Sequence, residues 1–137
     1  MASIRTETPI DAPPEDVWAA LRDFGAVHER LVPGFVTDCR LEEGDIRAVT
    51  FFNGVVAREM LVGIDDRARR LAYSVVEGPL GSTHHNASAE VIAENGRRSR
   101  FVWTADVLPD DLAAPMRELM EQGIGVIKRT LESETAR

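Results

Sequence analysis

Cysteine, long apolar runs and a secretion signal are the first features that this sequence lacks. Cys39 is the only cysteine in the 137 residues, which excludes an internal disulfide and a cysteine-based zinc site. No apolar run approaches the roughly 20 residues that span a bilayer as a helix, and residues 1–18 contain no apolar signal core. We therefore expect a single cytoplasmic domain over residues 1–137, long enough to bury a hydrophobic core.

Positive charge is the next shortage. The chain has 16 Lys and Arg residues against 23 Asp and Glu residues, a net charge of −7. The basic surface that nucleic-acid binding requires is therefore absent, and we expect the one basic cluster, Arg97, Arg98 and Arg100, to be solvated at a hairpin. The sequence also lacks a P-loop, a dinucleotide-binding glycine fingerprint and a Ser or Cys nucleophile motif, so we expect no cofactor.

What the sequence does contain is a regular succession of strand patterns between two helical regions. An alternating segment at 3–10 precedes two helical segments, at 11–23 and 26–34. Six further segments have strand patterns and are separated by short turns, at 35–41, 46–52, 56–64, 70–76, 85–93 and 99–107. Short turns imply that neighbouring strands run antiparallel.

The last segment, 110–134, has the apolar spacing of one long helix. Its apolar stripe recurs at intervals of three and four and consists of Leu112, Met116, Leu119, Met120, Gly123, Ile127 and Leu131. Gly123 and Gly125 lie inside this helix, where glycine costs up to about 1 kcal/mol relative to alanine. On the stripe, Gly123 allows either close packing of helix on sheet or space for a ligand, and spacing alone leaves both open.

This order of one strand, two helices, six strands and one helix predicts an α+β fold, in which a seven-stranded curved antiparallel sheet wraps around the C-terminal helix. It resembles the helix-grip fold of the Bet v 1-like or START-like superfamily (SRPBCC) over nearly the whole chain. The resemblance is carried by "TPIDAPPEDVWAALRDF" (8–24), "REMLVGIDDRARRLAYSVVEGP" (58–79) and "EQGIGVIKRTLE" (121–132). The last two segments are similar to bacterial polyketide cyclase/dehydrase-type proteins.

The resemblance implies a cavity between the sheet and the C-terminal helix. The central hairpin is similar to that of the plant abscisic acid receptors, which implies cavity positions for Glu59, Tyr73, Val75 and His85. The segment 35–41 is similar to a receptor strand with a ligand-anchoring lysine, but this chain has Thr37 there. The receptors' mobile gate loop also has no counterpart, and both departures argue against a receptor for that hormone.

The adjacent histidines His84 and His85 are expected to point in opposite directions. Side chains alternate across a strand, and the small apolar residues of 85–93, Ala87 among them, share the parity of His85. Two neighbours on a strand cannot bind one ion together, and His28 has no ligand spacing to either, so we expect no metal site. His85 is either a hydrogen-bonded core histidine or part of the cavity wall, and we favour the wall.

Two signals disagree about Glu59. Met60, Val62 and Ile64 form the apolar set of their strand, which places Glu59 outside, whereas the resemblance places it inside. We follow the resemblance. A buried carboxylate then requires a raised pKa, a water molecule or His85 as its partner.

Two aromatic residues complete the predicted cavity. Tyr73, the only tyrosine, shares a face with Leu71 and Val75, either as a core aromatic or as a hydroxyl donor to a ligand. Trp103 has inward parity and is expected to form wall. The predicted ligand-binding residues are Thr37, Glu59, Leu61, Tyr73, Val75, His85, Ala87, Trp103, Met116, Met120 and Gly123.

Two functions are compatible with these residues. One is binding of a small, largely apolar organic molecule in the cavity. The alternative is a cofactor-independent enzyme of the polyketide cyclase/dehydratase type, with His85 or Glu59 as general base and Tyr73 hydrogen-bonded to an enolate oxygen. An interaction protein of the same fold is a third possibility, although a ribosome binder would need a basic face. The ligand's identity, the cavity's size and the oligomeric state stay open.

Overall fold

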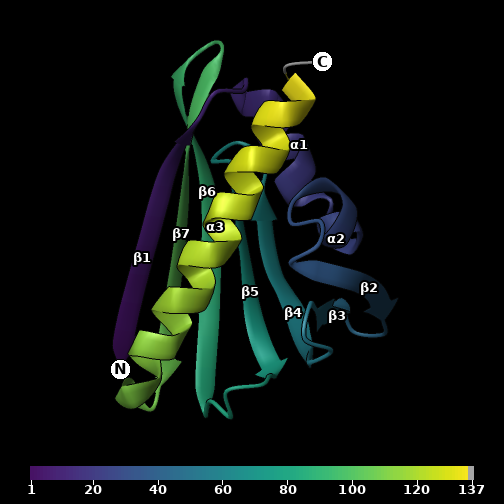
Figure 1. The fold of residues 1–137 in the computed structure, drawn as a ribbon, viewed down its shortest axis with the longest axis vertical. Helices are drawn as coiled ribbons and strands as arrows, with labels where there is room; N and C mark the ends of the chain where they lie inside the picture. Colours follow the sequence, from purple (N-terminus) through teal and green to yellow (C-terminus); the bar gives the residue numbers. More distant parts are fainter. Residues whose placement is uncertain (136–137) are drawn as a thin grey trace.

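The computed structural model describes residues 1–135 as a seven-stranded antiparallel sheet packed against a long C-terminal helix (Figure 1). The strands are β1 (Ala2–Ile10), β2 (Val36–Glu42), β3 (Ile46–Phe51), β4 (Val56–Asp65), β5 (Arg70–Glu77), β6 (His84–Asn95) and β7 (Arg98–Leu108). The α-helices are α1 (Pro14–Arg22), α2 (Val27–Arg30) and α3 (Ala113–Thr135), and single 3₁₀ turns occur at Phe24–Ala26 and Asp110–Leu112. The predicted helix-grip order is confirmed.

Each of the strands β2 to β6 pairs with the next strand along the chain, and β1 pairs with β7. The resulting order is β1-β7-β6-β5-β4-β3-β2. Short turns connect the successive strands except β5 and β6, which the loop 78–83 joins. In two of the turns Gly44 and Gly54 adopt φ angles of 81° and 85°, which other residues rarely tolerate. Between β1 and β2, the helices α1 and α2 carry the chain from one edge of the sheet to the other (Figure 1).

The hydrophobic core lies between the inner face of the sheet and α3, which runs diagonally across the strands in Figure 1. Four buried residues of α3 follow the predicted stripe: Met116, Met120, Ile127 and Leu131. Full burial of a side chain of this size contributes roughly 1.5–3 kcal/mol. Burial of the stripe therefore stabilises the packing of the helix on the sheet.

Polar contacts anchor the C-terminal part of α3 to the end of β1 and to the residue that follows it. Lys128 Nζ donates to the Pro9 carbonyl oxygen at 2.8 Å and to Glu132 Oε2 at 2.7 Å. Glu132 Oε2 also accepts a hydrogen bond from the backbone N–H of Asp11 at 2.9 Å. This end of the helix is thus fixed, and earlier turns of α3 lie over the cavity described below.

No helix within residues 1–135 combines the length and the apolar character that crossing a membrane requires.

Candidate ligand-binding cavity

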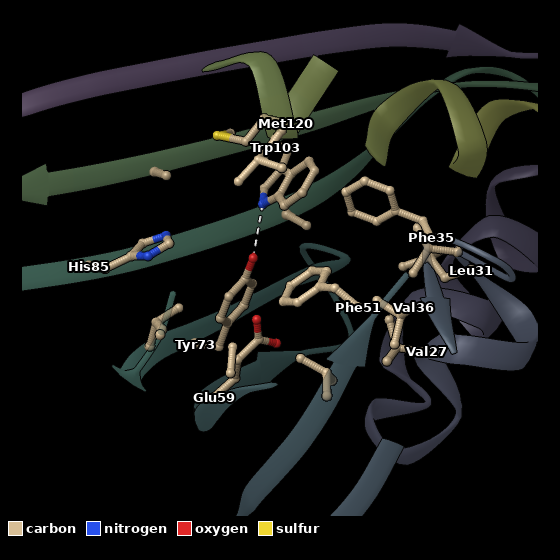
Figure 2. Close-up of a pocket in the computed structure, with 18 of the residues that line it drawn as sticks. Val27, Leu31, Phe35, Val36, Phe51, Glu59, Tyr73, His85, Trp103 and Met120 are labelled. Carbon is tan, nitrogen blue, oxygen red and sulfur yellow. Dashed lines mark hydrogen bonds between the residues drawn. The ribbon is translucent and has the colours of Figure 1, made fainter. Parts of the chain in front are cut away.

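A cavity of about 130 Å³ lies between the inner face of the sheet and α3. Most of its wall is apolar and comes from every layer of the fold: the α1–α2 region, the segment 31–36, the inner faces of β3 to β7, the β5–β6 loop and α3. The polar side chains in the wall are Arg47, Glu59, Tyr73, Ser82, His85 and Trp103. Figure 2 shows several of these groups beside Phe35, Phe51 and Met120.

Arg47 and Glu59 form a buried ion pair in the cavity wall. They lie opposite each other on β3 and β4, and Arg47 Nε donates to Glu59 Oε1 at 2.8 Å. Their side chains are only 8% and 12% exposed. Arg47 Nη1 also donates to the Phe24 carbonyl oxygen at 3.1 Å, and its guanidinium carbon lies 4.0 Å from the Phe24 ring centroid. Since an isolated buried charge is costly, each member of the pair depends on the other.

Tyr73 and Trp103 form the second polar contact of the wall. Trp103 Nε1 donates to Tyr73 Oη at 3.1 Å, the dashed line in Figure 2. Burial, together with the negative charge of Glu59, raises the pKa of the Tyr73 hydroxyl above its ordinary value. Among residues 1–135 no acceptor receives the hydroxyl hydrogen of Tyr73. That hydrogen is therefore available to a ligand.

His85 lies on β6 and points into the cavity, apart from the Tyr73–Trp103 pair (Figure 2). Burial, with a smaller contribution from His84, lowers the pKa of His85 to about 4. The imidazole is consequently neutral at pH 7 and carries one donor and one acceptor nitrogen. His84 is absent from the cavity wall, in agreement with the alternation that separated the two histidines.

Seven of the predicted ligand-binding residues line the cavity: Glu59, Tyr73, Val75, His85, Trp103, Met116 and Met120. Their contact with a ligand stays a prediction. Leu61 and Ala87 do not line the cavity; Ala87 is buried beside Tyr73 and Ala105, its neighbours in register, and Leu61 packs against the edge of the core.

Thr37 does not line the cavity either. It lies where the pairing of β2 and β3 shifts by one residue, since Val36 pairs with Phe51 and Asp38 pairs with Thr50. Val36 lines the cavity whereas its neighbour Thr37 is exposed, as the alternation of adjacent strand residues requires. Its hydroxyl donates to the Thr50 carbonyl oxygen at 3.3 Å.

Gly123 also lies outside the cavity wall, and of its two predicted roles the structure supports close packing. A Cβ added to Gly123 would lie 3.1 Å from Trp103 Cζ3 and 3.4 Å from Phe35 Cε2. The missing side chain therefore lets α3 approach the Trp103 ring closely. Gly123 affects the cavity only through the two aromatic rings that it touches, both of which line it.

Sequence reasoning missed Arg47, and with it the partner of Glu59. The predicted partner was His85, a water molecule or a proton, whereas the structure pairs Glu59 with Arg47. The signal was present in β3, because Arg47 has the same parity as Val49 and Phe51, which both line the cavity. An arginine in the inward set of one strand beside a glutamate in the next predicts such a pair.

Within residues 1–135, no group of three or more His, Cys, Asp or Glu side chains is arranged to hold a metal ion.

Comparison with known proteins places these features in a family context. A family model described as polyketide cyclase / dehydrase and lipid transport matches residues 1–133. A solved structure from Thermobifida fusca is 28% identical, with a TM-score of 0.77, and the match covers 93% of this chain and 91% of that one. The Bacillus cereus protein XoxI is 20% identical, with a TM-score of 0.85 over 96% of both chains.

A synthase shares the fold as well. Norcoclaurine synthase from Thalictrum flavum, solved in complex with dopamine and hydroxybenzaldehyde, is 18% identical, with a TM-score of 0.72 over 96% of this chain and 84% of that one. No curated protein sequence matches this chain.

Proposed function

The chain belongs to the polyketide cyclase/dehydrase and lipid transport family, and we propose that it binds a small, largely apolar organic molecule in the cavity between the sheet and α3. The observation that carries this proposal is the composition of the wall, which is apolar apart from a few converging polar groups. Such a combination is typical of small-molecule sites, where apolar contact supplies affinity and a few hydrogen bonds fix orientation.

Binding is favoured over catalysis by the state of the candidate acid–base groups. Glu59 is held by Arg47 at 2.8 Å, and Tyr73 accepts a hydrogen bond from Trp103. His85, with a pKa of about 4, is a weak base at pH 7, and general base catalysis is most efficient when the pKa lies near the working pH. These three groups are better suited to orienting a ligand than to moving protons.

The alternative is a cofactor-independent enzyme of the polyketide cyclase/dehydratase type. One observation favours it: His85 lines the cavity as a neutral imidazole without a hydrogen-bond partner among the described residues. In this alternative, His85 takes a proton from an acidic C–H group and the free hydroxyl hydrogen of Tyr73 stabilises the developing enolate oxygen.

Native mass spectrometry of the protein from its own host tests the proposal. We expect a small molecule that is retained under native conditions and lost on denaturation. Ala89→Leu, which adds bulk to the cavity wall, should abolish retention, whereas Ala93→Leu, at an exposed position of the same strand, should not. Equal retention by both variants would show that the molecule binds elsewhere and would contradict the proposal.

Native mass spectra of wild type and of a His85→Gln variant separate binding from catalysis. An unchanged molecule recovered from wild type and from His85→Gln supports binding. If wild type converts the molecule and His85→Gln accumulates it unconverted, the enzyme alternative is correct.

The cytoplasmic location, the single domain over residues 1–137 and the absence of a nucleic-acid partner stay predictions. The net charge of −7 supports the last of these, because phosphate backbones are bound by clustered basic residues.

A further inference from the structure

The charges in the cavity wall cancel. Of the described lining residues, only Arg47 and Glu59 carry permanent charge, and they pair with each other. At pH 7 His85 is neutral, because burial lowers its pKa to about 4, and Tyr73 keeps its proton, because burial raises the pKa of its hydroxyl. The wall therefore has no net charge to offer an ionic ligand.

The ion pair nevertheless has unused hydrogen-bonding capacity on both sides. Arg47 donates through Nε and Nη1, and within residues 1–135 its Nη2 has no acceptor. Glu59 accepts through Oε1, and its Oε2 has no donor. Among the described residues, the fully buried side-chain nitrogen and oxygen atoms without a partner are Thr6 Oγ1 and His28 Nδ1. Arg47 Nη2 and Glu59 Oε2 are not among them, so both atoms keep some accessible surface. A donor and an acceptor thus remain open on neighbouring strands in the cavity wall.

The volume of the cavity limits the size of its ligand. It measures about 130 Å³, and an apolar protein cavity of about 150 Å³ holds one benzene molecule. The flexible side chains of Met116 and Met120 in the wall allow modest adjustment. A molecule built on a single six-membered ring therefore fits the space.

On the premise that the cavity binds a ligand, we infer that it selects an uncharged molecule of about one ring, whose polar group both donates and accepts hydrogen bonds, as a hydroxyl or an amide does. The group accepts from Arg47 Nη2 and donates to Glu59 Oε2. An anion would lose its hydration on entering the cavity, and its attraction to Arg47 would be offset by repulsion from Glu59. A cation would lose its hydration in the same way, and its attraction to Glu59 would be offset by repulsion from Arg47. The pair therefore discriminates against both signs of charge.

Three molecules of nearly the same shape test this directly: benzamide is neutral, benzoate is an anion and benzamidine is a cation at pH 7. Dissociation constants are measured by isothermal titration calorimetry at pH 7, with toluene as the purely apolar reference. We expect wild type to bind benzamide at least about tenfold more tightly than either ion.

Single substitutions in the pair should reverse this order in opposite directions. Glu59→Gln leaves the charge of Arg47 uncompensated, so benzoate should become the preferred ligand. Arg47→Gln leaves Glu59 uncompensated, so benzamidine should become preferred. The double variant has no charge in the wall, and benzamide should again bind best. Glu42→Gln removes one acid from an exposed pair with Arg58 and should leave the wild-type order unchanged.

The wild-type measurements decide the inference even if a single variant does not fold. It is overturned if benzoate or benzamidine binds wild type as tightly as benzamide, or if toluene binds in the cavity and benzamide does not. In both cases the proposed function stands, because a ligand still occupies the cavity. If none of the four molecules binds, the one-ring inference is overturned, and the retained mass in the native spectrum decides the proposed function separately.

Discussion

Two neighbouring residues of β4, Arg58 on the outer face and Glu59 on the inner face, form ion pairs of similar length in very different surroundings. Arg58 pairs with Glu42 at 3.1 Å and Glu77 at 2.6 Å, and all three side chains are at least 39% exposed. Glu59 pairs with Arg47 at 2.8 Å, and neither side chain is more than 12% exposed. Water can replace a lost partner outside but not inside, so only the inner pair must stay complete.

On β4, two apolar residues are exposed while a charged residue is buried. Met60 and Val62 are 37% and 61% exposed, whereas the charged Glu59 is buried. Inside, a charge is tolerated because Arg47 compensates it. Outside, an apolar side chain costs little, since much of any folded protein's surface is apolar. Whether a residue of this strand lies on the inner or the outer face of the sheet is therefore indicated less well by its own polarity than by the partners on the neighbouring strands.

The largest expected effect comes from breaking the inner pair. Arg47→Met leaves Glu59 without its counter-charge and the Phe24 carbonyl without its donor, so the free energy of unfolding should fall by about 3–5 kcal/mol. Urea denaturation measures it. Arg58→Met is the matched control and should leave the midpoint unchanged. Removing both charges, in Arg47→Met with Glu59→Leu, should recover most of the loss. Equal midpoints for the two single variants would contradict the contrast between the faces.

The next effect is a pH dependence from the inward histidine. The folded-state pKa of His85 is about 4, against about 6.5 when unfolded, so below pH 6.5 the unfolded chain binds a proton that the folded chain does not. The contribution of His85 to the free energy of unfolding is therefore fully present above pH 6.5, and the free energy of unfolding should fall by up to about 3 kcal/mol as the pH drops to 4. Urea denaturation across this range measures it.

Comparison of the two histidine variants isolates the effect. His85→Gln should flatten the fall between pH 6.5 and 4, whereas His84→Gln should retain most of it. Carboxylates with lowered pKa values, such as Glu132, titrate alike in all three proteins and cancel in the comparison. A His85→Gln profile as steep as that of wild type would show that the ring is solvated.

The smallest effect distinguishes the two faces of α3. Gly125→Ala places its Cβ 3.4 Å from the flexible end of Arg129, so it should stabilise the protein by up to about 1 kcal/mol through helix propensity. Gly123→Ala meets Trp103, which is also held by Tyr73, and should destabilise by about 1 kcal/mol after that gain. Thermal denaturation compares the stability of the two variants. Equal stabilisation by both would show that the Trp103 ring moves to make room for the added methyl group.

The fold and the inward face of several strands followed from local rules. The strand alternation placed His85 inside and His84 outside the cavity wall, and the three- and four-residue spacing of α3 placed Met116 and Met120 over the cavity. The same alternation was not applied to β3, where it would have found Arg47. Thr37 was placed in the wall by the resemblance and not by alternation, and the structure leaves it exposed beside Val36, which lines the cavity.

By itself, the sequence determined the order of the elements, the antiparallel sheet and the apolar stripe of α3, because these depend on turns and on periodicity along one segment. Only the tertiary structure decided that Glu59 is paired with Arg47, that Tyr73 accepts from Trp103 and that Gly123 serves packing. Each of these contacts joins residues from different elements. Their geometry depends on strand register and on the approach of α3, which no single segment encodes.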